Sequence, residues 1–164
     1  MTKCRPIVII SACLLGQTVR YDGKSKAANL LPLINQGIAL VPVCPECAGG
    51  LPTPRAPCEI DPHADASKVL EGSCCIRNSL GEDCTEQYCR GAELCLDIAK
   101  HCHASLALLK DKSPACGTTL VHSGQFDGTL KAGRGIVAEL FERHGIKLFN
   151  EQQIEQLLKE IKKS

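Results

Sequence analysis

Two apolar runs near the start of the chain, separated by a helical pattern, constrain the fold more than any other feature. Residues 6–12 form a β-branched run that predicts a strand buried on both faces, and residues 38–44 form the next apolar run. Residues 27–34 carry apolar side chains at helical spacing, with Ser25 as the expected N-cap and Gly37 as the C-terminal glycine. A strand, a helix and a strand within fewer than 40 residues predict a right-handed βαβ unit with parallel strands.

Similar patterns continue to the end of the chain. They predict strands at residues 104–109 and 146–149, a hairpin or loop at 118–131, a helix from Thr85 to about 103, a helix at 136–144 before Gly145, and a last helix to about 162 after a near capping box of Asn150 and Gln153. A length of 164 residues suits one domain. We therefore predict a single α/β, Rossmann-like domain over residues 1–164, with a mainly parallel sheet and a ligand site at the carboxyl ends of its strands.

Residues 42–62 interrupt this pattern. They contain six of the nine prolines and a pair of glycines at 49 and 50, a composition that argues against regular helix or central strand. Loops of this length in compact domains are usually functional or disordered. We expect a long, shaped loop that contributes to a site, and make no assignment for residues 63–82.

Charge and aromatic content argue against a polymeric nucleic-acid partner. The formal net charge is +1, with 19 Lys and Arg against 18 Asp and Glu, so no basic excess would drive counterion release. Three Phe, two Tyr and no Trp leave little material for stacking successive bases. No segment approaches the ~18 apolar residues of a membrane span. We expect a small-molecule ligand and no membrane partner.

Twelve cysteines are the unusual feature of the composition, at about 7% of the chain. Short secreted disulfide scaffolds usually exceed roughly 8–10% and lack the periodic segments found here. Reduced thiols and metal ligands in a cytoplasmic protein fit better.

A bacterial lipoprotein is the alternative, because Lys3 and Arg5 precede an aliphatic run and residues 10–13 resemble a lipoprotein cleavage site. The run of four residues, 7–10, is shorter than the ~7–15 of a signal segment, and cleavage would remove the best strand candidate.

Three cysteines share a position in the predicted topology. Cys13, Cys44 and Cys116 each follow the carboxyl end of a predicted parallel strand and are flanked by Gly or Pro. Ligands of open parallel sheets bind beyond these strand ends, so the three thiols can meet at one point. Four thiolates would close an iron–sulfur cluster, whereas three leave one iron open for a substrate. The alternative is that all three are ordinary buried cysteines.

Cys44 also begins a C-x-x-C motif with Cys47, which suggests a redox pair or half a zinc site. We expect neither, because the motif enters a proline-rich loop and no second C-x-x-C or His pair completes a zinc site. The remaining cysteines are expected to be ordinary thiols. The five histidines show no ligand spacing; they are at positions 63, 101, 103, 122 and 144.

Glu46 lies two residues after Cys44, and Ser113 lies three residues before Cys116. Glu46 could act as general base for an attacking water, and Ser113 could hydrogen-bond the reacting group. Each has a plain alternative, since Glu46 could be a solvated carboxylate and Ser113 a turn former before Pro114.

Five motifs together resemble the thiouracil desulfurase (TudS) family. They are SACLLG at 11–16, RYDG at 20–23, VPVCPE at 41–46, GGLPTPR at 49–55 and SPACG at 113–117. The resemblance continues through Asp83 and Thr85, Gly91 and Ala92, and residues 126–135, and so covers nearly the whole chain.

This resemblance implies a Rossmann-like domain that holds a [4Fe-4S] cluster on Cys13, Cys44 and Cys116. It also implies that the open iron binds the sulfur of a thiolated uracil-type base, and that Glu46 and Ser113 catalyse a non-redox hydrolysis of C=S to C=O with release of sulfide. Alternatives are a desulfurase or sulfur carrier for another donor, including a tRNA thionucleoside, and a non-catalytic zinc or iron–sulfur module.

The chain departs from the family pattern in several places. Val19 stands where many relatives have a cysteine, so that position is not a ligand here. Cys47 and Cys58 occupy positions usually held by other residues, and Ala115 replaces a frequent serine. These differences bear on the substrate more than on the cluster.

Overall fold

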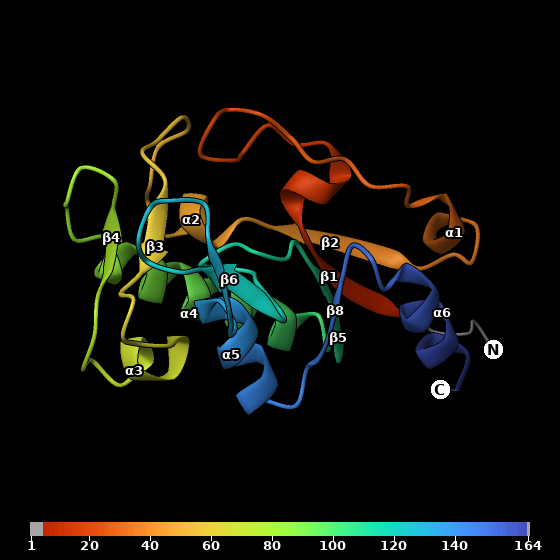
Figure 1. The fold of residues 1–164 in the computed structure, drawn as a ribbon. Helices are drawn as coiled ribbons and strands as arrows, with labels where there is room; N and C mark the ends of the chain where they lie inside the picture. Colours follow the sequence, from red (N-terminus) through yellow and green to blue (C-terminus); the bar gives the residue numbers. More distant parts are fainter. Residues whose placement is uncertain (1–4, 164) are drawn as a thin grey trace.

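The centre of the molecule is a four-stranded sheet whose neighbouring strands are all parallel (Figure 1). The computed structural model describes residues 5–163, so Lys3 of the lipoprotein alternative lies outside it. The sheet has the order β2-β1-β5-β8, formed by β1 (Ile7–Ser11), β2 (Ala39–Val43), β5 (Leu106–Leu109) and β8 (Lys147–Asn150). This confirms the predicted α/β architecture with a mainly parallel sheet.

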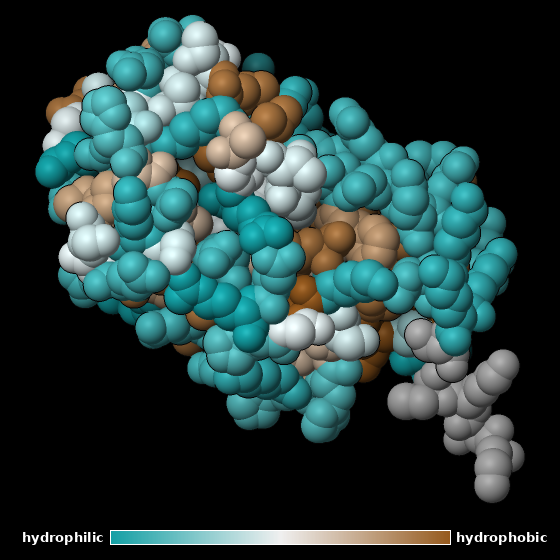
Figure 2. Space-filling view, turned by 60° about the horizontal axis from the view of Figure 1, so that its bottom comes forward, coloured by the Kyte–Doolittle hydropathy of each residue, from teal (hydrophilic) through white to brown (hydrophobic). Residues whose placement is uncertain are grey.

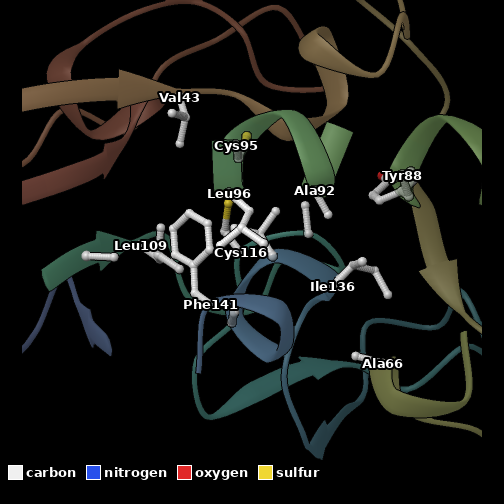
Figure 3. Packing of buried hydrophobic residues seen from close by; sticks show 14 of the residues in the cluster. Val43, Ala66, Tyr88, Ala92, Cys95, Leu96, Leu109, Cys116, Ile136 and Phe141 are labelled. Atoms are coloured by element: carbon white, nitrogen blue, oxygen red, sulfur yellow. The ribbon is translucent and has the colours of Figure 1, made fainter. Parts of the chain in front are cut away.

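Alternate residues of the central strands face opposite sides of the sheet, as the two-residue period of a strand requires. Ile9 faces a cluster formed with α4 (Thr85–His101) and α5 (Ile136–Arg143). Val8 and Ile10 face a second cluster, formed with α1 (Leu31–Ile34) and α6 (Ile154–Lys163). All three side chains are fully buried, at roughly 1.5–3 kcal/mol of stabilisation each. Figure 3 shows the first cluster, with Phe141 of α5 near Leu96 of α4.

Two small antiparallel sheets lie outside the central one. Strands β3 (Cys58–Ile60) and β4 (Ile76–Asn78) form the first, and β6 (Leu120–His122) and β7 (Leu130–Ala132) form the second. Figure 1 shows β3 and β4 at the opposite end of the molecule from α1 and α6, with α3 (Ala66–Leu70) beside them. The predicted hairpin at 118–131 is thus confirmed as β6–β7.

The helix predicted at residues 27–34 is wrong in its extent. Only α1, Leu31–Ile34, is helical, and it begins after Leu30 rather than Ser25. Pro32 sits at the start of α1, where its missing N–H costs nothing, but a longer helix would have needed that N–H as a donor. The extended residues before it attach to the loop after β1, since Lys26 N donates to Cys13 O at 3.0 Å and Ala28 N to Leu14 O at 2.9 Å.

The expectation that residues 42–62 contain no regular helix is wrong for α2 (Pro45–Ala48), whereas the expectation that they contain no central strand is confirmed. Pro42 lies within β2, Pro45 begins α2, and residues 58–60 form β3. Each proline takes a position that tolerates it, because β2 is an edge strand of the sheet and Pro45 occupies the first turn of a helix.

The remaining helices and strands agree with the sequence to within a few residues. Cys84 occupies the N-cap position of α4 without a side-chain capping hydrogen bond, and the Thr85 hydroxyl oxygen accepts a hydrogen bond from Ile76 N at 2.9 Å. Asn150 N donates to the Gln153 side chain at 3.0 Å, but Asn150 ends β8 and α6 begins only at Ile154, so this pair does not cap the helix as predicted. The face in Figure 2 is mainly hydrophilic with small hydrophobic patches. No helix of the described part of the chain is long and apolar enough to cross a membrane.

Candidate active site

The three predicted ligands lie around one cavity at the carboxyl edge of the parallel sheet. Strands β1 and β5 are neighbours, but β1 leads to β2 on one side and β5 leads to β8 on the other. Such a switch in strand order opens a crevice between the two strand ends. Cys13 lies in a 3-10 helix after β1, Cys44 directly after β2, and Cys116 in the loop after β5. All three line a cavity of about 500 Å³.

Burial controls the chemistry of these thiols. Cys13 and Cys116 are 8% and 5% exposed, and Cys44 is half-buried. Burial raises the pKa of Cys13, although the charges of Lys110 and Arg20 oppose it. Burial likewise raises the pKa of Cys44 to about 12 and that of Cys116 well above its usual value. Figure 3 shows Cys116 packed in the first hydrophobic cluster, near Leu96. Soft sulfur donors are the ligands that an iron–sulfur cluster takes.

Among residues 5–163, no three His, Cys, Asp or Glu side chains converge closely enough to hold a single metal ion. In an iron–sulfur cluster each cysteine binds a different iron, so its ligands line a cavity and need not meet at one ion.

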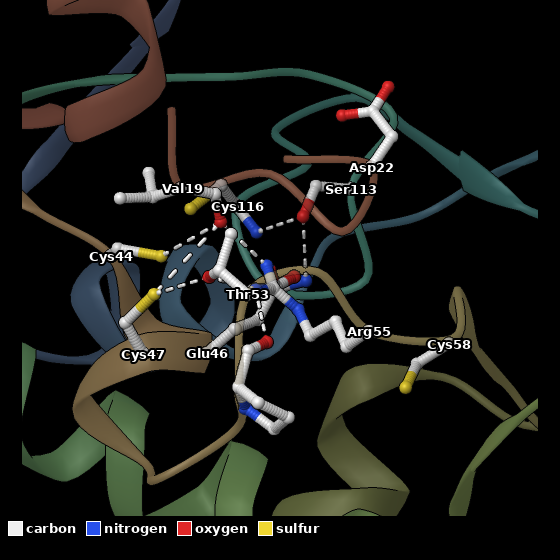
Figure 4. Close-up of polar contacts among 12 residues, drawn as sticks. Val19, Asp22, Cys44, Glu46, Cys47, Thr53, Arg55, Cys58, Ser113 and Cys116 are labelled. Atoms are coloured by element: carbon white, nitrogen blue, oxygen red, sulfur yellow. Dashed lines mark hydrogen bonds and ion pairs between the residues drawn. The ribbon is translucent and has the colours of Figure 1, made fainter. Parts of the chain in front are cut away.

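Glu46 is held in a fixed position inside the cavity. One oxygen of its carboxylate forms an ion pair with Arg55 (Figure 4). The other oxygen accepts a hydrogen bond from the Tyr88 hydroxyl at 3.2 Å. The Glu46 and Arg55 side chains are 15% and 5% exposed. Burial disfavours the charged form of Arg55 and so lowers its pKa, but the interactions with Glu46 and its neighbours together have the larger effect, and the pKa of Arg55 is raised. Burial and the Glu46 charge raise the Tyr88 pKa well above its usual value, so its hydroxyl stays protonated and donates.

Arg55 also fastens the surrounding loops. Its guanidinium donates to the carbonyl of Val19 at 3.0 Å and to that of Pro52 at 3.1 Å. Its backbone N–H donates to Tyr21 O at 2.8 Å, which joins the loop that follows β1 to the loop that follows α2. The sequence placed Arg55 and Tyr21 in family motifs but gave them no role.

Two glycines position α2, the short helix that carries Glu46. A Cβ atom on Gly91 would lie 1.8 Å from the Pro45 carbonyl oxygen, and one on Gly49 would lie 1.9 Å from the Gln87 carbonyl oxygen. Helix α2 therefore packs backbone to backbone against α4. This contact fixes Cys44, the N-cap of α2, and Glu46 in its first turn relative to the core.

Ser113 lines the same cavity and shapes the turn before Cys116. Its hydroxyl oxygen accepts hydrogen bonds from Ala115 N at 3.1 Å and Cys116 N at 3.3 Å. Ser113 therefore forms a turn, as the alternative to a catalytic role expects. The hydroxyl hydrogen is still available to donate into the cavity, because both backbone groups act as donors.

The C-x-x-C motif does begin a helix, contrary to the sequence interpretation, because Cys44 caps α2. Cys47 is not among the described residues that line the cavity. Its sulfur lies 3.5 Å from the Thr53 hydroxyl and 4.0 Å from Val19 O (Figure 4).

The opposite wall of the cavity was missed by the sequence analysis. It is formed by β3 and the β6–β7 hairpin, which contribute Glu59, His122 and Phe126. Neither Glu59 nor His122 shows a spacing typical of metal ligands. Phe126 was noticed only as part of a family-like stretch, with no role attached to it.

The fold and the cavity define an α/β protein with a thiol-lined ligand site at the carboxyl edge of its sheet. The sequence profile of the 2-thiouracil desulfurase family matches residues 8–153, and the chain belongs to this family. This confirms the resemblance of the sequence motifs, and with it the prediction of an enzyme of the desulfurase class.

Individual relatives span nearly the whole chain. It is similar to the uncharacterized protein YbbK of Bacillus subtilis (strain 168), at 35% identity over 152 residues that cover 93% of this chain and all of YbbK. It is also similar to the solved structure of a [4Fe-4S]-dependent thiouracil desulfidase, TudS. That match has a TM-score of 0.85 and 38% identity, and covers 98% of this chain and 100% of the other.

Proposed function

We propose that this protein is a [4Fe-4S]-dependent, non-redox desulfurase that hydrolyses the C=S group of thiolated uracil-type bases. The observation that carries the proposal is that Cys13, Cys44, Cys116, Glu46 and Ser113 line one cavity. The family and the thiouracil desulfidase neighbour support the same reaction. The whole chain, residues 1–164, would act as one domain.

Cys13, Cys44 and Cys116 would hold the cluster. Three protein ligands leave one iron without a cysteine, which is how catalytic metal sites differ from structural ones. When bound, the cluster would supply a Lewis-acidic iron for the sulfur of the substrate.

The protein residues supply the proton transfer. Glu46 would take a proton from the attacking water, and Arg55 and Tyr88 hold its carboxylate in place for this task. The Ser113 hydroxyl would donate a hydrogen bond to the reacting group. The water oxygen replaces sulfur at the ring carbon, the sulfur leaves as sulfide, and no electrons are gained or lost.

A small thiolated base suits the cavity, whose volume of about 500 Å³ lies in the range of small-molecule sites. The net charge of +1 gives no support for binding an RNA polymer. We also propose a cytoplasmic location, because the eleven cysteines of the described part are all free thiols and reduced thiols persist there.

The test is sulfide release by anaerobically reconstituted protein. We expect turnover of 2-thiouracil or 4-thiouracil, measured beside the corresponding nucleosides and thiolated tRNA. Protein with a full iron content that releases no sulfide from any free base would refute the function. Turnover of tRNA alone would correct the substrate class.

Variants separate ligands from catalysts. Serine at position 13, 44 or 116 should abolish the cluster, whereas Cys47→Ser, three residues from Cys44, should retain it. Glu46→Gln should keep the iron content and the cluster absorbance but lose turnover. A fully active Glu46→Gln protein would show that Glu46 is not the base.

A further inference from the structure

An aromatic side chain is held over the cavity by the loop between β6 and β7. Phe126 lines the cavity and is 41% exposed, although its backbone is anchored. Its φ angle is +55°, in the left-handed region that a bulky residue rarely adopts. Backbone strain of this kind persists only where neighbouring contacts enforce it, and it is concentrated at functional sites.

Glu59 of β3 supplies the enforcing contacts. One oxygen of its carboxylate accepts hydrogen bonds from Gly124 N at 2.7 Å and Phe126 N at 3.1 Å. Glu59 is 8% exposed, so a buried charge is used to hold the loop. Gly124 has φ +92°, and a Cβ atom there would lie 2.4 Å from Ile60 O, so the loop presses directly on β3.

The two tyrosines at the cavity are placed differently, and Tyr88 is buried and hydrogen-bonded to Glu46. Tyr21 also lines the cavity and is 42% exposed, but the Arg20 guanidinium lies over its ring, 5.5 Å from the centroid. The Phe126 ring belongs to neither hydrophobic cluster. Core packing therefore does not account for its position.

We propose that Phe126 stacks on the planar ring of the bound base, and that Glu59 is a positioning residue that holds Phe126 there. This inference rests on the proposed function and names the part of the site that recognises the ring rather than its sulfur. A flat aromatic face suits a pyrimidine, because every base presents a π-face whatever its substituents. Stacking of this kind strengthens binding of substrate and product alike, so it acts on KM more than on kcat.

The test compares Phe126→Ala, Phe126→Tyr, Glu59→Ala and the double variant with wild type. We measure kcat and KM for 4-thiouracil, the dissociation constant of uracil by calorimetry, and the iron content. We expect Phe126→Ala to raise KM and the uracil dissociation constant about tenfold, with iron content and kcat close to wild type. Phe126→Tyr keeps the ring and should behave as wild type.

Non-additivity tests the role of Glu59. If Glu59 acts through Phe126, Glu59→Ala weakens uracil binding, and the double variant binds no more weakly than Phe126→Ala. Leu130→Ala is the matched control, because Leu130 belongs to the same hairpin with 38% exposure but is not among the described residues lining the cavity. Phe126→Leu, which keeps apolar bulk without a flat ring, replaces Phe126→Ala if thermal unfolding shows that the alanine variant does not fold.

If wild type is active but Phe126→Ala has the same KM and uracil dissociation constant as wild type, the stacking role of Phe126 is refuted. The proposed function is not affected by that result. Fully additive effects would overturn the role of Glu59. A wild-type protein with full iron that neither releases sulfide nor binds uracil would instead refute the proposed function, and the stacking role with it.

Discussion

Replacing Gly91 by alanine tests whether the contact between α2 and α4 sets the position of the site. The new Cβ atom would lie 1.8 Å from the Pro45 carbonyl oxygen and 2.7 Å from its carbon, whereas real Cβ contacts essentially never fall below 3.0 Å. Helix α2 would therefore have to move away from α4 by about 1 Å or more. The displaced segment carries Cys44 at its N-cap and Glu46 in its first turn.

The sign of the stability change distinguishes this mechanism from ordinary helix propensity. In a helix interior, Gly→Ala normally stabilises by about 1 kcal/mol. Overpacking a tight contact costs about 1–3 kcal/mol, and a backbone contact as short as 1.8 Å belongs to the upper part of that range, about 2–3 kcal/mol. We expect the contact to dominate, with a net loss of about 1–2 kcal/mol and a Tm lower by roughly 2–8 °C. Because Cys44 moves, the variant should also retain less iron than wild type.

The assay combines thermal unfolding of the cluster-free protein with iron and sulfide content after anaerobic reconstitution. Leu94→Ala is the control, since Leu94 lies on the same helix and is 42% exposed. It should leave the iron content at the wild-type level. A Gly91→Ala protein that is at least as stable as wild type and binds a full cluster would show that the close approach does not position the site.

Three further changes probe other parts of the site. Arg55→Met leaves Glu46 buried without its ionic partner, so unfolding by urea should show a loss of about 3–5 kcal/mol, and Arg55→Lys should lose less. Tyr88→Phe removes one hydrogen bond to Glu46; kcat should fall several-fold at unchanged iron content, and an unchanged kcat would contradict the arrangement. Asp111 is partly buried, which raises its pKa, but hydrogen bonds from Thr119 and from backbone N–H groups outweigh burial and lower it below 3.8. Its stabilising effect is therefore complete above about pH 5 and is lost below about pH 4, so acid titration should show the stabilities of wild type and Asp111→Asn converging.

The convergence of the three proposed ligand positions on one cavity could be predicted from sequence because their placement follows from topology. Parallel strands end at the same edge of a sheet, so cysteines that follow separate strands approach one another whatever their distance in the chain. Cys13 and Cys116 are about 100 residues apart and still line one cavity. The strands themselves were readable, because each is a short apolar run.

The contacts that make Glu46 a plausible base could not be predicted. Arg55, in a loop, and Tyr88, in α4, contact the Glu46 side chain. Gly91 of α4 packs against α2, the helix that carries Glu46. No periodic pattern in the sequence predicts these contacts. The short helix α2 in the proline-rich stretch could not be predicted for a related reason. Proline excludes a central strand or a helix interior, but an edge strand and a first helical turn tolerate it, and only the assembled sheet shows that β2 is an edge.

The cavity is divided between two parts of the chain with separate physical tasks. The cysteines and Glu46 lie on connections from the parallel sheet, whereas Phe126 and Glu59 belong to the small antiparallel sheets. No cysteine proposed as a ligand lies on that second wall within residues 5–163. Substitutions there should therefore change how tightly a thiolated ring is bound without changing iron content.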